Sequence, residues 1–511
     1  MAKVGALPAP QVVLVGFMGA GKSTTGRRLA AALGRPFADS DELLEQRLGE
    51  PIASFFEREG ETAFRERERE LVLELLDRAE PSVIALGGGA VESESVREAL
   101  TIHCAARVDV DPETAWQRAS GTARPLARDR DSFLRLYERR LELYESVAPL
   151  GVTWSETEGD HPVFVGAGAL AAVGDLWPCP QGRAFLVEDE GAARFHGAGL
   201  RAALEGRVEV AGHVAVAPGE QTKSLSEVER VLRAMAGASV QRGDAVVALG
   251  GGVAGDLAGF CAATYQRGIA WVQVPTTLVA QVDSAYGGKT GVDLPEGKNY
   301  VGAFHQPAAV FTDPATLATL PSEELASGWA EVVKTALIAG GTLWHGVRAL
   351  PPLGEAIESS LDAVAGVVQA CARTKLAVVA VDERDTGYRA SLNLGHTFAH
   401  ALESATGYER YRHGEAVALG LLVALRLSER ELGLDPSIRQ EARDLLGREN
   451  LPTSFAGPGT ELLLEHAGRD KKRSGDRRNL VLLRAPGDVV THVEVAEEAL
   501  VEAIDELRSG T

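Results

Sequence analysis

Cysteine is scarce in this chain of 511 residues, and Cys104, Cys179, Cys261 and Cys371 form no CxxC pair. This spacing excludes a zinc ribbon or a dithiol redox motif and is typical of a reducing compartment. Apolar runs are short as well: the longest, Ala416–Leu425, contains a glycine and is too short to span a bilayer. The N-terminal segment shows no signal-peptide pattern. We therefore expect a soluble, cytoplasmic protein without a membrane partner.

Basic residues are in the minority, with 52 Lys plus Arg against 72 Asp plus Glu and a net charge of −20. This balance argues against nucleic acid as the partner, because nucleic-acid binding needs a basic face. Lysine is especially rare, at nine residues. Lysine differs from arginine as a compact ammonium whose pKa shifts readily. We expect the few lysines to mark sites for small anionic substrates.

The pattern of apolar runs divides the chain into three parts, which we place at residues 1–155, 161–312 and 313–511. The first two alternate predicted strands, such as Val12–Val15, with predicted helices, such as Lys22–Leu33, which indicates α/β sheets. The third consists mainly of apolar-periodic helices. Leu150–Pro162 is polar and poorly periodic, and we interpret it as the junction between the first two parts.

A phosphate-binding motif lies near the N-terminus. Residues Gly16–Ser23 fit G-x-x-x-x-G-K-S between a predicted strand and a predicted helix, the context that this motif requires. Backbone N–H groups of such a loop surround phosphate oxygens, Lys22 reaches the outer phosphates, and the Ser23 hydroxyl binds Mg²⁺. The motif therefore predicts ATP or GTP binding. The residues that we assign to the nucleotide within it are Gly19, Gly21, Lys22, Ser23 and Thr24.

Several charged residues farther along suggest a small anionic acceptor for the phosphoryl group. Asp39 and Asp41 follow the second predicted strand, and a glycine run ends the third. Arginines on the following segments are suited to clamp a carboxylate and to cover phosphates. With these residues, the stretch Gln11–Val152 resembles shikimate kinase.

The resemblance to shikimate kinase implies a P-loop α/β fold like that of nucleoside monophosphate kinases, with roles for individual residues. It implies that Asp41, Arg65, Gly88 and Arg140 bind shikimate, that Asp39 holds Mg²⁺ through water, that Arg118 lies against adenine and that Arg124 belongs to a lid. Among these, Lys22, Asp41 and Arg124 are expected to be catalytic. The kinase-like part departs from the family at its C-terminal end, where we expect the last strand and the last helix of the kinase to be missing.

A second group of motifs indicates a dinucleotide and a metal. Glycines follow a predicted strand at Gly250–Asp256, an arrangement that lets a dinucleotide approach the backbone. His396 and His400 share one helical face by their i, i+4 spacing, and His413 and Glu331 lie in neighbouring helical motifs. Three histidines and a carboxylate suit an open, catalytic Zn²⁺ site. Spacing alone nominates both His396 and His400 as ligands.

Long strings such as GGGVAGDLAGF and LNLGHTFAHALE make residues 162–506 closely similar to 3-dehydroquinate synthase. The resemblance implies a Rossmann-like NAD-binding half, followed by an all-α metal-binding half in which Glu331, His396 and His413 bind Zn²⁺ or Co²⁺. It assigns His400 to the substrate instead. For NAD⁺ it implies Glu220, Lys223, Gly251, Gly252, Asp256, Thr276, Thr277, Asp283, Ser284, Lys289 and Lys298. For the heptulosonate phosphate it implies Arg267, Lys289, Lys298, Asn299, Lys334, Lys375, Arg389, Asn393, His400 and Lys471.

Both resemblances together imply a bifunctional enzyme of aromatic amino-acid biosynthesis that phosphorylates shikimate and converts 3-deoxy-D-arabino-heptulosonate 7-phosphate into 3-dehydroquinate. The expected catalytic residues of the second reaction are Asp283, Lys289, Lys334, Lys375, Arg389, Asn393 and His400. The family also implies a homodimer in which Arg267 reaches the substrate of the partner subunit. Two alternatives remain: a kinase-like part that is only a binding module, and another sugar-phosphate cyclase in place of the synthase.

Overall fold

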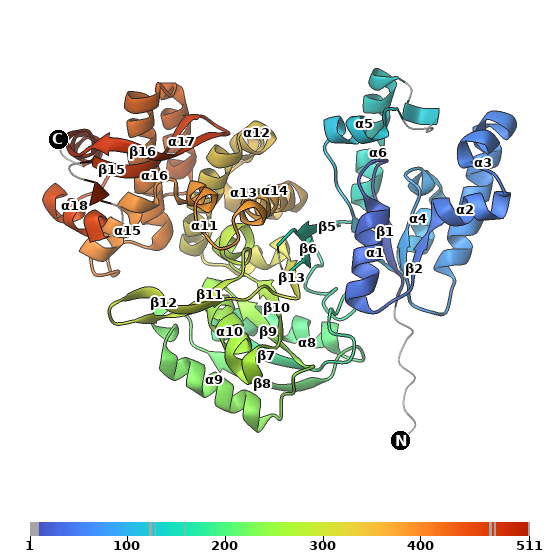
Figure 1. Ribbon diagram of the computed structural model, residues 1–511, viewed down its shortest axis with the longest axis horizontal. Coiled ribbons are helices and arrows are strands. Elements are labelled where there is room, and N and C mark those ends of the chain that lie inside the picture. The colour runs from blue at the N-terminus through green and yellow to red at the C-terminus, as the bar shows by residue number, and fades with distance from the viewer. Residues whose placement is uncertain are drawn as a thin grey trace.

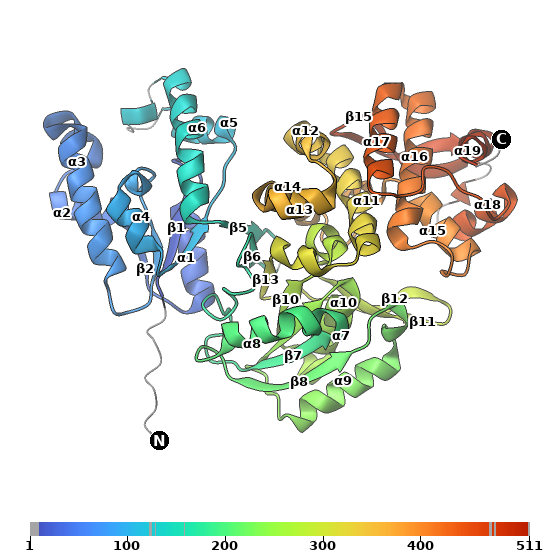
Figure 2. The same ribbon diagram turned by 180° about the vertical axis from the view of Figure 1, so that it is seen from behind.

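The computed structural model describes residues 10–121, 125–127, 129–157, 159–469, 473–474 and 477–508. Its strands, helices and termini are arranged as in Figure 1, and Figure 2 shows the reverse side. The N-terminal part forms one lobe, and the rest of the chain forms a second lobe in which helices lie over one end of an α/β layer.

One sheet runs through both lobes. Its strand order is β2-β3-β1-β4-β5-β6-β13-β10-β9-β7-β8, and every neighbouring pair is parallel except β5 and β6. The strands are β1 Val12–Val15, β2 Phe37–Asp39, β3 Val83–Ala85, β4 Cys104–Arg107, β5 Leu150–Ser155, β6 His161–Val165, β7 Ala184–Asp189, β8 Val210–Val216, β9 Ala245–Gly250, β10 Ala270–Pro275 and β13 Ala309–Thr312.

Strand β5 contradicts two of our expectations. We predicted that the last strand of the kinase-like part is missing, but β5 continues that parallel sheet beside β4, with Ala106 opposite Leu150. We also interpreted Leu150–Pro162 as an irregular junction, whereas β5 and β6 form an antiparallel hairpin across it. Polar residues such as Thr153 and Ser155 hid the strand from a search for apolar runs. The final helix of the family is missing, as predicted, and β6 follows β5 in its place.

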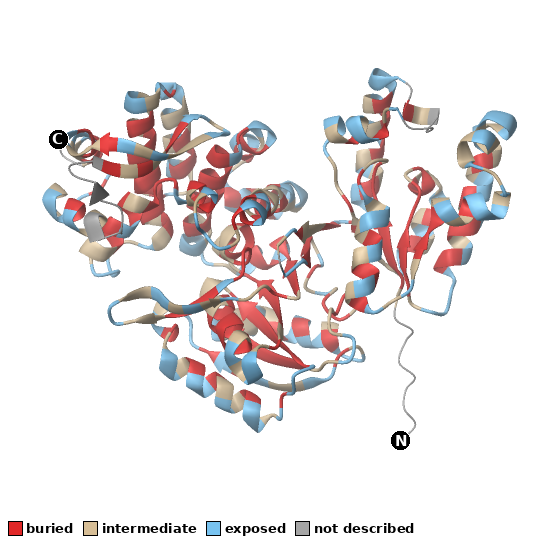
Figure 3. Cartoon of the chain, viewed as in Figure 1, coloured by how far each residue is buried: buried red, intermediate tan, exposed pale blue. Residues whose placement is uncertain are grey.

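The two lobes also share a hydrophobic core. Leu14 of β1 and Leu29 of helix α1 (Lys22–Leu33) belong to the same cluster of buried side chains as Phe164 of β6 and Leu200. Buried residues accordingly follow the strands across the whole sheet in Figure 3. The apolar area removed from water at this junction stabilises one fixed arrangement of the lobes.

Helices cover the sheet in both lobes. Those of the first lobe are α1, α2 Ser40–Leu48, α3 Ile52–Leu76, α4 Glu94–Leu100, α5 Pro112–Ala119 and α6 Arg130–Val147, with short turns η1 Ala90–Glu92 and η2 Pro125–Ala127. Those between β7 and β13 are α7 Glu190–Ala192, η3 Ala193–Gly197, α8 Ala198–Leu204, η4 Glu220–Thr222, α9 Leu225–Gly237, α10 Gly252–Thr264, η5 Tyr265–Arg267 and η6 Ala280–Ser284. A separate hairpin, β11 Lys289–Leu294 with β12 Gly297–Phe304, follows η6.

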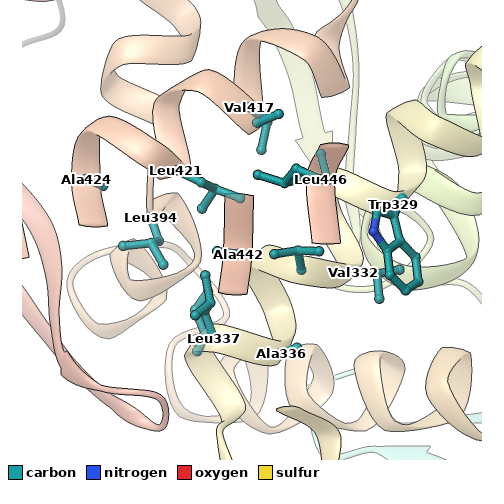
Figure 4. Close-up of a cluster of buried hydrophobic side chains, with 14 of the residues drawn as sticks. Trp329, Val332, Ala336, Leu337, Leu394, Val417, Leu421, Ala424, Ala442 and Leu446 are labelled. Atoms are coloured by element: carbon teal, nitrogen blue, oxygen red, sulfur yellow. The ribbon is translucent and has the colours of Figure 1, made fainter. Parts of the chain in front are cut away.

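The last part is largely helical, as expected. Its helices are η7 Pro314–Thr319, α11 Ser322–Ala339, α12 Gly341–Ala349, α13 Leu353–Ser359, α14 Leu361–Val381, η8 Tyr388–Asn393, α15 His396–Ala405, α16 His413–Leu432, α17 Pro436–Arg448, α18 Thr460–Arg469 and α19 Glu497–Glu506. Figure 4 shows their shared core, a single cluster that includes Trp329 and Leu337 of α11 and Leu421 of α16. A small antiparallel sheet, β14 Arg473–Ser474, β15 Arg477–Ala485 and β16 Asp488–Ala496, is an addition that we did not predict.

Helix α14 is long and apolar enough to cross a membrane by length and composition alone. Half of its most apolar 18-residue window is buried inside the protein, however, and it packs against β5, α11 and α13. We therefore interpret α14 as a core helix. The expected fold class is confirmed: a P-loop α/β unit, a Rossmann-like α/β unit and a helical unit follow one another along the chain.

Candidate active sites

The first site is the loop between β1 and α1. Gly16 has a φ of 144°, and a Cβ atom there would lie 2.4 Å from the carbonyl oxygen of Val108, so that this position requires glycine. Lys22 folds back over the loop and donates to the carbonyl oxygens of Gly16 and Phe17, at 2.8 and 3.1 Å. The loop is therefore shaped around the space in which a phosphate chain would lie.

Ser23 and Asp39 meet at the start of α1. The Ser23 hydroxyl lies 2.6 Å from Oδ2 of Asp39, at the end of β2. The other carboxylate oxygen of Asp39 accepts from the backbone N–H groups of Asp41 and Glu42 and so caps α2. This cap fixes the carboxylate beside the hydroxyl, and a hydroxyl with an adjacent carboxylate is the oxygen pair that Mg²⁺ uses in such loops.

The expected acceptor residues also converge on this site. Arg140 is only 2% exposed, and its Nε donates to Glu92 at 3.0 Å, while Arg65 donates to Glu68 at 2.6 Å. Tyr144 donates to the carbonyl oxygen of Gly88 at 2.5 Å. Burial alone would raise the pKa of Glu92, but Arg140 and Arg65 lower it below its ordinary value.

Two further arginines were expected near the nucleotide. Arg118 on α5 donates to the carbonyl oxygen of Gly19 at 3.1 Å, so it lies at the edge of the phosphate loop. Arg124 lies outside the described residues, as does Lys471 in the second site. Their expected roles rest on the resemblance alone.

The second site begins where β9 and β10 end side by side. Pro275 pairs with Gly250, and the N–H group of Thr276 donates to the carbonyl oxygen of Gly250 at 2.9 Å. Helix α10 starts there, at Gly252, and directs its first N–H groups toward this edge, the usual place for a dinucleotide diphosphate. Thr277 and Ser284 contact the same glycines: a Cβ on Gly251 or Gly252 would come within 2.9 Å of them.

A charged group borders that edge. The Nζ of Lys223 lies 2.8 Å from Asp256 and 3.6 Å from Glu220, and it also contacts Asn299. Lys298 lies 3.9 Å from Glu220. The structure thus brings together five of the expected residues, from η4 and the residue after it, from α10 and from β12.

Two lysines surround Asp283 at the centre of the site. The Nζ of Lys334 lies 3.2 Å from Asp283 and 2.5 Å from Glu331, and Lys375 contacts the other oxygen of Asp283. Burial by itself would raise the pKa of Asp283, but the two ammonium groups lower it to about 2. Burial lowers the pKa of Lys375 despite this partner. The site therefore holds cationic groups in a dry environment.

Arg389 enters from η8, where Asn393 also lies. Its guanidinium donates to the carbonyl oxygens of Glu383 at 2.9 Å and Gly287 at 3.3 Å. The carboxylate of Asp382 accepts hydrogen bonds from the backbone N–H groups of Thr386 and Arg389, at 2.8 and 2.9 Å. These hydrogen bonds lower the pKa of Asp382. Sequence reasoning missed Asp382, which shapes the turn that presents Arg389.

The expected metal ligands form one cluster. Donor atoms of Glu331, His396 and His413 all lie within 4.8 Å of one another. The Nε2 atoms of His413 and His396 lie 3.0 and 3.5 Å from Glu331. His400 is not a member of this group. The structure thus groups the set that the resemblance implied and not the pair that spacing alone nominated.

The outer contacts of these histidines suit a metal site. The Nδ1 of His396 lies 3.2 Å from the carbonyl oxygen of Leu394, and that of His413 lies 3.5 Å from Glu403, so both Nε2 atoms face inward. Burial alone would lower the pKa of His413, but Glu331 and Glu403 raise it to about 10. Sequence reasoning missed Glu403, although it lies seven residues after His396 on the same helical face.

Arg267 does not join this site. It precedes β10, whereas Thr276 follows it, and the strand between them is about 17 Å long at the usual rise per residue. Arg267 is exposed at the opposite edge of the sheet.

Comparison with known proteins matches separate parts of the chain to two families. A model of the shikimate kinase family matches residues 18–161, and models of the N-terminal and C-terminal parts of 3-dehydroquinate synthase match residues 213–327 and 328–473. A 3-dehydroquinate synthase from Symbiobacterium thermophilum is 44% identical over 357 residues, which cover 69% of this chain and 99% of that protein. The one from Caulobacter vibrioides is 41% identical over 355 residues, covering 67% and 95%.

Among solved structures, the chain resembles 2-epi-5-epi-valiolone synthase from Streptomyces hygroscopicus subsp. jinggangensis, which was solved with NAD⁺ and Zn²⁺ bound. The TM-score is 0.61 with 26% identity, over 68% of this chain and 96% of that one. The chain belongs to the 3-dehydroquinate synthase family and carries a shikimate kinase domain ahead of the synthase.

Proposed function

We propose that this protein catalyses two reactions of aromatic biosynthesis: ATP-dependent phosphorylation of shikimate, and cyclisation of 3-deoxy-D-arabino-heptulosonate 7-phosphate to 3-dehydroquinate with release of phosphate. The observation that carries this proposal is the presence of two separate polar sites, one in each lobe. We place the kinase at residues 1–155 and the two halves of the synthase at 161–312 and 313–511.

In the kinase, Lys22 neutralises the outer phosphates of ATP, and Ser23 binds Mg²⁺ with Asp39 as its outer partner. Asp41 lies two residues further along the chain, in the first turn of α2, where it orients the hydroxyl of shikimate. Arg65 and Arg140 bind the carboxylate of shikimate. Arg65 pairs with the buried Glu68 and Arg140 pairs with the half-buried Glu92, so a substrate carboxylate exchanges one ion pair for another at a prepared position.

In the synthase, Glu331, His396 and His413 hold Zn²⁺ or Co²⁺, and the glycines after β9 hold NAD⁺. When bound, the metal polarises a substrate hydroxyl, and NAD⁺ takes up a hydride and returns it. Lys334, Lys375 and Arg389 bind the negative charges of the substrate in a site from which water is largely excluded. His400 and Asn393 orient the substrate or carry its protons.

We infer that the protein acts as a homodimer in the cytoplasm. The support is the position of Arg267, which lies at the far end of β10 from its own site and can serve a substrate phosphate only in another copy. Sedimentation measures whether the protein is a dimer. Arg267→Ala tests the role of Arg267 in the partner's site. If the sites are shared between subunits, synthase activity returns when the inactive Arg267→Ala variant is mixed with an inactive variant that lacks Lys334.

The decisive experiment measures both reactions on one preparation. With ATP and Mg²⁺, ADP should form only when shikimate is present; with the heptulosonate phosphate, NAD⁺ and Zn²⁺, phosphate should be released. If no ADP forms in response to shikimate, the first lobe is a binding module and not a shikimate kinase. No phosphate release would point to another sugar-phosphate cyclase, which valiolone-type substrates would then reveal.

A further inference from the structure

Helix α14 connects the two sites physically. It lies beside β5 and β6 at the middle of the shared sheet, as both views show, and on its other side it packs against η6 and η8. These two elements contain Asp283 and Arg389 of the synthase site. The helix thus lies between the kinase sheet and the synthase substrate site.

One face of α14 is fastened to the kinase lobe. Arg373 lies 2.8 Å from Oδ2 of Asp109, which follows strand β4. One turn earlier, the buried side chain of Gln369 lies over β5, so close that a Cβ atom on Gly151 would come within 1.9 Å of its Nε2. Only a glycine leaves room for this contact. Residues four apart share one helical face, and both therefore point toward the kinase.

The opposite face carries the synthase chemistry. Lys375 follows Arg373 by two residues, about 200° around the helix axis. Its ammonium group contacts Asp283, whose other oxygen pairs with Lys334. The position of the Lys375 amine thus depends on how α14 is placed, and the ion pair that holds α14 nearest to Lys375 is the one between Arg373 and Asp109 of the kinase lobe.

Asp109 is itself a rigid anchor. It is only 15% exposed and also pairs with Arg107 of β4. The preceding residue, Val108, pairs with β1 and touches the phosphate loop at Gly16. The carboxylate is therefore held by the central strands of the kinase sheet and not by a loose surface loop.

We propose that Arg373 is a positioning residue of the synthase. Its ion pair with Asp109, together with the contact of Gln369 with β5, fixes α14. Lys375 is thereby held against Asp283, and the kinase sheet is a structural part of the synthase site. This inference rests on the proposed role of Lys375. An error of about 1 Å in such a group costs up to about 100-fold in rate.

The test compares synthase kinetics of the full chain with substitutions on both sides of the pair. We expect Arg373→Ala and Asp109→Asn each to lower kcat by about tenfold and to shift the alkaline limb of the pH–rate profile, because the amine loses its fixed distance to Asp283. The double variant should be no worse than either single one, and Arg373→Lys should recover most of the loss.

Matched controls separate positioning from general loosening. Arg28 also bridges the lobes, through Asp160 and over the ring of Trp154, but it does not touch α14. Arg28→Ala should leave the synthase pH profile unchanged. The proposal is overturned if Arg373→Ala leaves kcat and the profile within about twofold of the parent chain, or if Arg28→Ala has the same effect. If Lys375→Met does not change the synthase rate, the proposed role of Lys375 is wrong, and the positioning role of Arg373 that depends on it is wrong too.

Discussion

The Nε2 atom of His413 lies 3.0 Å from Oε1 of Glu331, whose own side chain is completely buried. A buried carboxylate against an imidazole nitrogen, with a second imidazole nearby, is a donor set that suits a divalent cation. The same donor atoms are suited to zinc by number and type.

His413→Ala should therefore remove the metal. We expect the purified variant to lose bound Zn²⁺ and the synthase rate to fall by at least about 100-fold, since two ligands do not hold a catalytic ion. The metal content and the rate of phosphate release measure this. His345 on α12 is an exposed histidine, and His345→Ala is the matched control; an equal loss there would contradict the assignment.

Glu403→Gln should weaken the metal site without abolishing it. Glu403 fixes the orientation of His413 through Nδ1, and loss of such an outer partner costs about 10–100-fold in metal affinity. A competition titration with a zinc chelator measures the change. Glu409→Gln, in an exposed position beyond the same helix, should have no effect.

Lys22→Met should separate the two activities. Because the ammonium group of Lys22 already lies over the phosphate loop, its loss should lower shikimate-dependent ADP formation by at least about 100-fold. Phosphate release from the heptulosonate phosphate serves as the internal control and should stay unchanged. A parallel loss of both rates would be evidence against two independent sites.

His161 should make the protein sensitive to acid. It begins β6 and is 1% exposed; its Nδ1 lies 2.8 Å from the carbonyl oxygen of Gly159, and burial lowers its pKa from 6.5 to about 4. The unfolded chain therefore binds more protons between these values, and the stabilisation present above pH 6.5 is lost as the pH falls toward 4. The shift corresponds to about 3 kcal/mol.

Thermal unfolding at pH 7 and pH 5 tests this effect in the parent chain and in His161→Asn. We expect the difference between the two midpoints to be smaller in the variant. Equal differences would assign the acid sensitivity to other groups.

Gly420→Ala should disturb the metal site from a distance. A Cβ atom there would lie 2.1 Å from the carbonyl oxygen of Gly395, just before α15, so α15 and α16 would have to separate and draw His396 away from His413. We expect a loss of about 1–3 kcal/mol in stability together with weaker metal binding. A Cβ atom on Gly366 of α14 would meet nothing within 4 Å, and Gly366→Ala should leave stability unchanged or raise it by up to about 1 kcal/mol.

The sequence by itself determined the local elements and the chemistry of both sites. The predicted strand Val12–Val15 and the predicted helix Lys22–Leu33 have the bounds expected from the sequence. The phosphate loop was identified from its motif, because the residues of that motif are fixed by the phosphate chain that they hold. The set of Glu331, His396 and His413 came from the resemblance to 3-dehydroquinate synthase, since spacing alone nominated His396 together with His400.

Only the tertiary structure decided how the two enzymes are joined. Strand β5 includes the polar residues Thr153 and Ser155, and it pairs with β4, while β6 pairs with β13; no local pattern records these hydrogen-bond partners. The contacts of Arg373 with Asp109 and of His413 with Glu403 likewise depend on which elements pack together. Local propensity and ligand chemistry depend on residues that are close in the sequence. Strand pairing and side-chain contacts between distant segments depend on the free energy of the whole fold.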